Sequence, residues 1–308
     1  MKTVFHHLAV SLLAAAAFSH SAAAEVVRSN FTYRLSDSNG ALPLSWATLN
    51  WDPSAGELYV IDSSTATVDV FNDNGMQVFA FGNDSGVGTV VGAVPVEGGD
   101  LVVLAVKTED WSLVRANFRG EPIAKIPLSG VPAGFSPSAL RGANGKLYLA
   151  DRNSLKIVEV EISGAVSASW DLAKLLKLDV KKHPGNDLRG FNVSPDGNVL
   201  GTISGLFLAF VLTPDGEVHS FGTRGSTPGK FNIVAGIAAD QSGRLYVTDT
   251  LRAVVIVFDK EFKFIGEFGY RGYDDENLVA PNEIAVGNGR VFVSQSVGGV
   301  KAFEVVFQ

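Results

Sequence analysis

The stretch Gly-Glu-Leu-Tyr-Val-Ile-Asp at residues 56–62 returns as Gly-Lys-Leu-Tyr-Leu-Ala-Asp at 145–151 and as Gly-Arg-Leu-Tyr-Val-Thr-Asp at 243–249. Weaker copies of the same pattern occupy residues 99–105, 197–203 and 289–295. One position aligns across all six copies: Tyr59, Val102, Tyr148, Leu200, Tyr246 and Phe292. The steps between these residues are 43, 46, 52, 46 and 46. An internal period in the forties therefore organises most of the chain.

Each repeat consists of short apolar runs joined by turns that contain Gly and Asp. In the fifth repeat the runs are 233–239, 244–248, 253–259 and 264–268. Gly and Asp suit the turns because these need a positive φ or a hydrogen bond from side chain to backbone. A period of this length, with four strands per repeat, is typical of a β-propeller. The sequence therefore predicts an all-β fold, a six-bladed propeller.

The sixth repeat has too few strands to complete a blade. It offers runs at 283–286, 290–294 and 300–307 before the chain ends at Gln308. A three-stranded blade would leave an open sheet edge. Residues 26–35 alternate between apolar and polar side chains, as a strand does. We expect this N-terminal strand to close the last blade and the ring.

The first 24 residues have the pattern of a cleaved secretory signal. Lys2 supplies a basic start, residues 8–18 are apolar, and residues 22–24 are all Ala. We expect cleavage near Ala24/Glu25, a mature propeller over residues 25–308, and a periplasmic or secreted location. No later segment reaches about 18 uninterrupted apolar residues, so we expect no membrane insertion.

The net charge of the chain indicates which kinds of partner are disfavoured. The chain has 25 Lys and Arg against 32 Asp and Glu, a net charge of −7 at pH 7. This balance disfavours nucleic acid and anionic membrane surfaces. The chain has no Cys, so its stability depends on the core rather than on disulfides. We expect a monomer.

At this point the chain resembles a known family. Phe221-Gly222, Gly229-Lys230-Phe231 and the runs 236–240, 243–249 and 255–259 look like the consensus of the NHL repeat. The resemblance covers roughly residues 45–306 and implies a six-bladed propeller. It does not fix a function, since NHL propellers include protein-binding and RNA-binding platforms and the frames of some enzymes.

The sequence offers little material for catalysis by His. Three of the five His lie in the signal segment, which leaves His183 and His219. A zinc centre or a Ser/His/Asp triad is therefore not expected. The amidating lyases that resemble NHL propellers depend on metal-binding His and on Cys, and this chain lacks that set.

Three Asp residues end the second strands of repeats one, three and five: Asp62, Asp151 and Asp249. We expect each to cap the following turn by accepting backbone N–H bonds. The alternative is that they line the channel and hold Ca²⁺, which prefers carboxylate ligands.

Aligning the inner strands places six residues at one equivalent position near the mouth of the central channel: Ala47, Gly92, Ser138, Arg189, Ala235 and Asn282. We expect the three small residues to widen the mouth and Ser138, Arg189 and Asn282 to bind a ligand. Arg152 and Arg252 follow second-strand Asp residues and could join them. Such a set suits an anionic or carbonyl-bearing ligand. The alternative is that the Arg residues form surface ion pairs with nearby Asp.

An insertion lengthens the step between the third and fourth repeats. Residues 171–182 predict a short amphipathic helix with Asp171 as its N-cap. We expect it to pack over a blade edge or, alternatively, to bind a partner.

These observations favour an exported, non-catalytic binding scaffold that recognises an unknown protein through a loop-rich face. One alternative is a Ca²⁺-dependent propeller hydrolase, lactonase or lyase. Sugar-lactonase propellers centre on Glu, Asn and Asp ligands, and here Asn282 and Glu283 are adjacent. Another alternative is a binder of glycans or of the cell wall.

Overall fold

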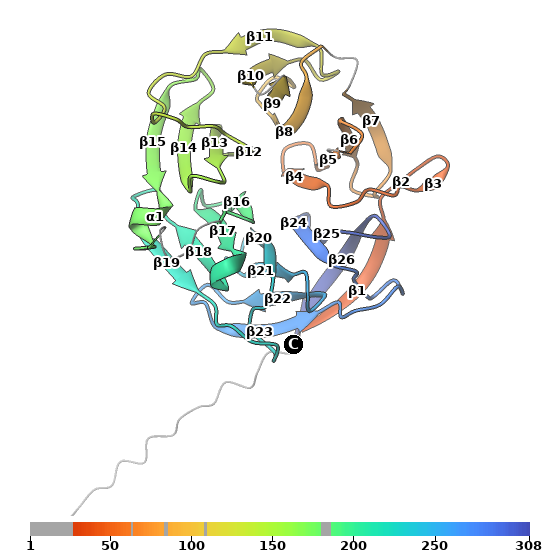
Figure 1. Ribbon diagram of the computed structural model, residues 1–308. Helices are drawn as coiled ribbons and strands as arrows, with labels where there is room; N and C mark the ends of the chain where they lie inside the picture. Colours follow the sequence, from red (N-terminus) through yellow and green to blue (C-terminus); the bar gives the residue numbers. More distant parts are fainter. Residues whose placement is uncertain (1–26, 63, 83–85, 108–109, 180–185) are drawn as a thin grey trace, which may run out of the picture.

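The computed structural model describes residues 27–62, 64–82, 86–107, 110–179 and 186–308. Six four-stranded antiparallel sheets surround a central axis, so the predicted six-bladed β-propeller is confirmed (Figure 1). The expected signal segment lies outside the described residues. Within the described ranges no helix is long and apolar enough to cross a membrane.

The first three blades follow one another along the chain, each running from the inner to the outer strand. Blade 1 contains β4 (Thr48–Asp52), β5 (Glu57–Asp62), β6 (Thr67–Phe71) and β7 (Gln77–Phe81). Blade 2 contains β8 (Thr89–Pro95), β9 (Leu101–Lys107), β10 (Asp110–Ala116) and β11 (Pro122–Ile126). Blade 3 contains β12 (Ala139–Ala143), β13 (Lys146–Asp151), β14 (Lys156–Glu161) and β15 (Val166–Asp171).

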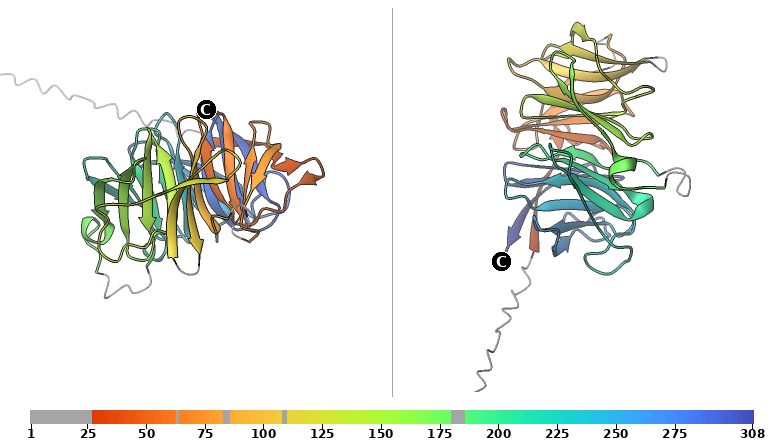
Figure 2. Two further views of the ribbon diagram at one scale, coloured as in Figure 1. Left: turned by 90° about the horizontal axis from the view of Figure 1, so that it is seen from above. Right: turned by 90° about the vertical axis from the view of Figure 1, so that its left-hand side faces the viewer.

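The last three blades complete the ring. Blade 4 contains β16 (Phe191–Val193), β17 (Val199–Ile203), β18 (Leu208–Leu212) and β19 (Val218–Phe221). Blade 5 contains β20 (Val234–Ala239), β21 (Leu245–Asp249), β22 (Val254–Phe258) and β23 (Phe264–Phe268). Blade 6 contains β24 (Pro281–Gly287), β25 (Arg290–Gln295), β26 (Val300–Phe307) and β1 (Val27–Arg34). A small hairpin of β2 (Ser36–Asp37) and β3 (Gly40–Ala41) projects from the ring (Figure 1 and the left view of Figure 2).

The N-terminal strand closes the ring, as predicted. β1 pairs antiparallel with β26, from Val27 opposite Phe307 to Arg34 opposite Lys301. The two strands come from opposite ends of the chain and lie side by side (Figure 1). Closure removes the open edge that a three-stranded sixth blade would present.

Packing between blades holds the ring together. The six aligned repeat positions all lie on second strands and are buried. Polar side chains also join neighbouring blades: Asn50 Nδ2 donates to the Ala93 carbonyl at 2.7 Å, and Thr248 Oγ1 donates to the Asn282 carbonyl at 2.7 Å. These bonds fix the height of each blade relative to the next.

The insertion forms a shorter helix than the sequence predicted. α1 (Leu172–Leu175) is a single turn, and the Asp171 carboxylate caps it by accepting the N–H of Lys174 at 3.2 Å. The N-cap prediction is therefore confirmed. The predicted extension to Lys182 is wrong, because Lys177 adopts a positive φ of 53° that a helix cannot continue through. Residues 180–185 lie outside the described ranges.

Candidate functional site

Four of the five predicted ligand-binding residues meet at one end of the central channel. Arg152 donates to the Arg189 carbonyl at 2.8 Å, and its own N–H approaches Ser138 Oγ at 3.4 Å. Arg189 Nη2 donates to Asn282 Oδ1 at 2.8 Å. These contacts bring Ser138, Arg152, Arg189 and Asn282 together from blades 3, 4 and 6, and their role in binding a ligand stays a prediction.

A buried ion pair beneath these residues crosses the channel. Arg141 on β12 of blade 3 reaches Glu283 on β24 of blade 6, with Nη2 and Oε2 3.3 Å apart. Arg152 Nη2 lies 3.7 Å from the other carboxylate oxygen. Arg141 is 1% exposed. Arg141, Arg152, Arg189, Asn282 and Glu283 are called the axial cluster below.

Sequence reasoning missed Arg141, although a signal was present. Arg141 stands within Ala-Leu-Arg-Gly-Ala, an inner strand of otherwise small and apolar residues. A charge in such a strand has to be buried, and buried charges need a partner. Burial lowers the pKa of Arg141, Glu283 opposes this shift, and the nearby charge of Arg152 adds to it.

Arg252 does not join the axial cluster. Its Nη2 contacts Glu267 Oε1 at 2.5 Å, and its Nη1 donates to the Lys230 carbonyl at 3.0 Å. Both partners lie at blade 5, so the expectation that Arg252 lines the channel mouth is wrong. The alternative expectation, that the Arg residues pair with nearby Asp, is also wrong for Arg252 and Arg152. Arg252 pairs with Glu267, and Arg152 pairs with Glu283.

The three small residues at the aligned position do not widen the mouth. Ala47 and Ala235 are buried. A Cβ built on Gly92 would lie 2.7 Å from the Cβ of Leu140 in the next blade. These positions stay small because inner strands converge closely near the axis, and the predicted widening is wrong.

The three second-strand Asp residues cap turns. Asp62 accepts the N–H of Ser64 at 2.8 Å, and Asp151 accepts that of Ser154 at 3.1 Å. Asp249 accepts four backbone N–H groups, including that of Asn232 at 2.6 Å. At least one oxygen of each carboxylate thus accepts a backbone N–H bond, as expected for a turn cap. Over the described ranges no group of three or more His, Cys, Asp or Glu is arranged to hold a metal ion.

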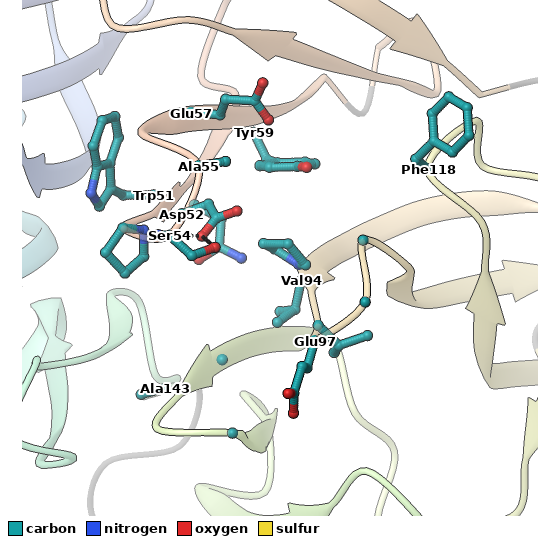
Figure 3. A pocket seen from close by; sticks show the side chains of 18 of the residues that line it. Trp51, Asp52, Ser54, Ala55, Glu57, Tyr59, Val94, Glu97, Phe118 and Ala143 are labelled. Carbon is teal, nitrogen blue, oxygen red and sulfur yellow. Dashed lines mark hydrogen bonds between the residues drawn. The ribbon is translucent and has the colours of Figure 1, made fainter.

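A cleft of about 820 Å³ opens at the other end of the inner strands, among blades 1, 2 and 3 (Figure 3). Four aromatic side chains line it: Trp51, Tyr59, Phe79 and Phe118. Phe79 and Phe118 are 37% and 61% exposed, with ring centroids 6.4 Å apart. A second hollow of about 630 Å³ shares Asn50, Trp51 and Gly142 with it and extends towards blades 4 to 6.

Carboxylates accompany the aromatic rings in the cleft. Asp52, Glu57 and Glu97 all line it. Burial, followed by the charge of Asp52, raises the pKa of Glu57. Burial likewise raises the pKa of Tyr59, with Glu57 and Asp52 adding to the shift. The one lysine of the lining, Lys146, is paired with Glu159 at 2.5 Å, so the cleft presents mainly negative charge.

The cleft was also missed from the sequence. Its only signal is Val-Phe-Ala-Phe at residues 78–81, a continuous apolar run on an outer strand. Outer strands of a propeller have one face in solvent, so such a run leaves apolar groups exposed. The four aromatic side chains come from β4, β5, β7 and the turn after β10, and only the fold brings them together.

Comparison with known proteins supports the fold. No family model matches the chain. A 66-residue stretch is 36% identical to Protein brain tumor of Drosophila melanogaster, but it covers 21% of this chain and 6% of that protein. A streptogramin B lyase structure aligns over 92% of this chain and 98% of its own, with a TM-score of 0.60 and 10% identity.

Two further solved structures are similar. Virginiamycin B lyase from Staphylococcus aureus aligns over 84% of this chain and 79% of its own, with a TM-score of 0.56 and 12% identity. A gluconolactonase from Xanthomonas campestris aligns over 91% and 90%, with a TM-score of 0.57 and 16% identity. At these identities the likeness establishes the propeller architecture, and function has to be argued from the site.

Proposed function

We propose that this protein is an exported, non-catalytic binding scaffold that holds a partner protein at the cleft of blades 1 to 3. The observation that carries the proposal is the exposure of Phe79 and Phe118 beside a concave surface. Aromatic side chains in and around a concavity are typical of the residues that dominate protein–protein binding energy. Export is part of the proposal because residues 1–24 have the pattern of a secretory signal.

The chemistry of the cleft favours a particular kind of partner surface. Apolar side chains of the partner would bury Phe79 and Phe118, whereas Lys or Arg would meet Asp52, Glu57 and Glu97. Basic groups also interact favourably with aromatic faces such as that of Trp51. We therefore propose a partner segment with an apolar or aromatic anchor flanked by basic residues. Complementary charge would also speed its association with this acidic protein.

The axial cluster supports a binding role over Ca²⁺-dependent catalysis. Glu283, the acidic residue beside Asn282, is already contacted by Arg141 and Arg152. Guanidinium groups at these distances repel a divalent cation. Asp62, Asp151 and Asp249 accept backbone N–H bonds with their carboxylates.

A second candidate function is that of a propeller lyase or lactonase. It is favoured by the similar solved structures, which include a virginiamycin B lyase and a gluconolactonase. Glycan or cell-wall binding is a third candidate, because aromatic rings beside carboxylates also suit sugars.

We further propose that the repeats are of the NHL type, because residues between 221 and 259 resemble the consensus of that repeat.

The test of the scaffold proposal is affinity capture followed by measured binding. Wild type and a Phe79→Ser/Phe118→Ser variant would be used to capture proteins from an extract of the native organism. Any protein specific to wild type would then be purified and titrated against both. Because both rings are exposed, the variant should keep its fold and melting temperature. Loss of two aromatic anchors should weaken binding by about tenfold or more.

Phe264→Ser is the matched control, because Phe264 is an exposed aromatic residue on the outer strand of blade 5, outside the cleft. It should bind as wild type does. Equal affinity of the purified partner for wild type and the double variant would contradict recognition at the cleft. Turnover of a lactone or a streptogramin by the purified protein would replace the scaffold proposal with the enzyme candidate.

A further inference from the structure

The axial cluster contains more positive than negative charge. Three guanidinium groups, those of Arg141, Arg152 and Arg189, face one carboxylate, that of Glu283. The remaining partner, Asn282, is a neutral amide that accepts from Arg189 through Oδ1. Arginine stays protonated in folded proteins, so this imbalance persists at every physiological pH.

Two N–H groups of the cluster have no acceptor. Arg141 Nε and Arg152 Nε are both buried, and neither donates a hydrogen bond within the described part of the chain. The other Arg141 nitrogens are engaged, Nη1 by the Leu140 carbonyl at 3.1 Å and Nη2 by Glu283. A buried donor without an acceptor is costly, and more so when it carries charge. The two Nε donors therefore need an acceptor in addition to Glu283, and the excess positive charge favours an anionic one.

The cluster can be reached from outside. Ser138, at the same end of the channel, is exposed, and Arg152, Arg189 and Asn282 are each partly exposed above the buried Arg141. A small ligand entering there would meet Arg189 and Arg152 first and Arg141 last. The two outer guanidinium groups would attract an anion to this end of the channel.

We propose that the axial channel binds a small oxyanion, a carboxylate or a phosphate group, between Arg141, Arg152 and Arg189. Its oxygens would accept the N–H bonds that the two Nε atoms now lack and would offset the excess positive charge. Guanidinium groups are well suited to both kinds of oxyanion because they donate several N–H bonds in one plane. This site lies at the opposite end of the inner strands from the cleft, so it does not depend on the proposed partner protein.

The test is calorimetric titration of the full chain with inorganic phosphate and, separately, with acetate. Both would be run against chloride at equal ionic strength, so that general salt effects cancel. Saturable binding of either anion at one site per chain is expected. Binding of phosphate alone would identify a phosphate site, and binding of acetate alone a carboxylate site.

Variants separate the axial site from other basic groups. Arg152→Gln and Arg189→Gln, chosen because these side chains are partly exposed, should each weaken binding by about tenfold or more. Arg119→Gln makes the same change in net charge at an exposed turn and should bind as wild type does. Absence of binding by both anions, or equal binding by wild type and both channel variants, would overturn the proposal. Partner capture at the cleft tests the scaffold function independently.

Discussion

Glu159 shows how this protein keeps a carboxylate charged inside a blade. Lys146 Nζ donates to it at 2.5 Å, Ser167 Oγ at 2.7 Å and Tyr148 Oη at 3.0 Å. Burial alone would raise the pKa of Glu159, but these three hydrogen bonds and the charge of Lys146 together hold it below the usual value. The charged form is therefore favoured in the folded state.

This lowered pKa predicts how stability depends on pH. A carboxyl whose pKa falls on folding stabilises the protein above its unfolded value, near 4.5, and loses that contribution as pH falls through the folded value. Glu159→Gln should therefore destabilise the protein most at neutral pH, and the difference from wild type should shrink below about pH 4.5. Urea unfolding from pH 7 to pH 3 measures it, with the exposed Glu304→Gln as control. A difference that stays constant over this range would contradict the assignment.

Residues of the site were harder to predict than residues of the turns. Asp62 and Asp249 could be assigned as caps because their partners lie within a few residues or in the same repeat. Arg141 and Glu283 are 142 positions apart and meet only because blades 3 and 6 face each other across the axis. Their pairing depends on how far each side chain reaches across the axis and on the tilt of the strands. The alignment of the repeats gives neither quantity.

At the scale of elements, strands were predictable wherever local pattern decides them. The Gly and Asp turns set the hairpins, and the second strands follow as continuous apolar runs, such as β21 and β13. α1 is shorter than predicted. The apolar side chains are spaced as in a longer helix, but the positive φ of Lys177 ends the helical backbone. The strand predicted over residues 26–35 is present as β1. Its alternating apolar and polar side chains indicated a strand, and β1 pairs with the otherwise open edge of β26.

Ring closure by β1 predicts a large effect of N-terminal truncation. A chain that starts at Ala41 lacks β1 and exposes the edge of β26, including the backbone groups that now pair over residues 301–307. Apolar contacts would also be lost, since Phe31 packs edge-on against Phe303 with ring centroids 6.2 Å apart. We expect aggregation or a marked fall in melting temperature, because unpaired edges associate readily.

Thermal unfolding and light scattering would measure this, with a chain that starts at Val27 as the matched control. The control keeps all of β1 and removes only residues 1–26, so it should remain as stable as the full chain. If the chain from Ala41 stayed monomeric with an unchanged melting temperature, closure by β1 would not be a source of stability.

At the scale of the whole molecule, the two ends of the channel differ in charge. The end with Ser138 and Arg189 leads to a cation-rich interior, whereas the cleft end presents Asp52, Glu57 and Glu97. The two ends of the ring therefore differ in charge although the six blades share one backbone structure. The difference arises because equivalent positions carry different side chains. The position Arg141 of blade 3, for example, corresponds to Asn50 in blade 1 and Ala285 in blade 6.

The charge of the channel leads to a prediction about metal. Arg141, Arg152 and Arg189 disfavour a cation at the axis, and the three turn-capping Asp residues are engaged by backbone N–H groups. Treatment with EDTA should therefore leave the melting temperature unchanged, as should added Ca²⁺. A Ca²⁺ ion that bound only the native state would contribute about 2.7 kcal/mol at a hundredfold excess over its Kd, a shift easily seen in thermal unfolding. Stoichiometric Ca²⁺ in the dialysed protein, lost with EDTA together with stability, would instead support the hydrolase, lactonase or lyase candidate.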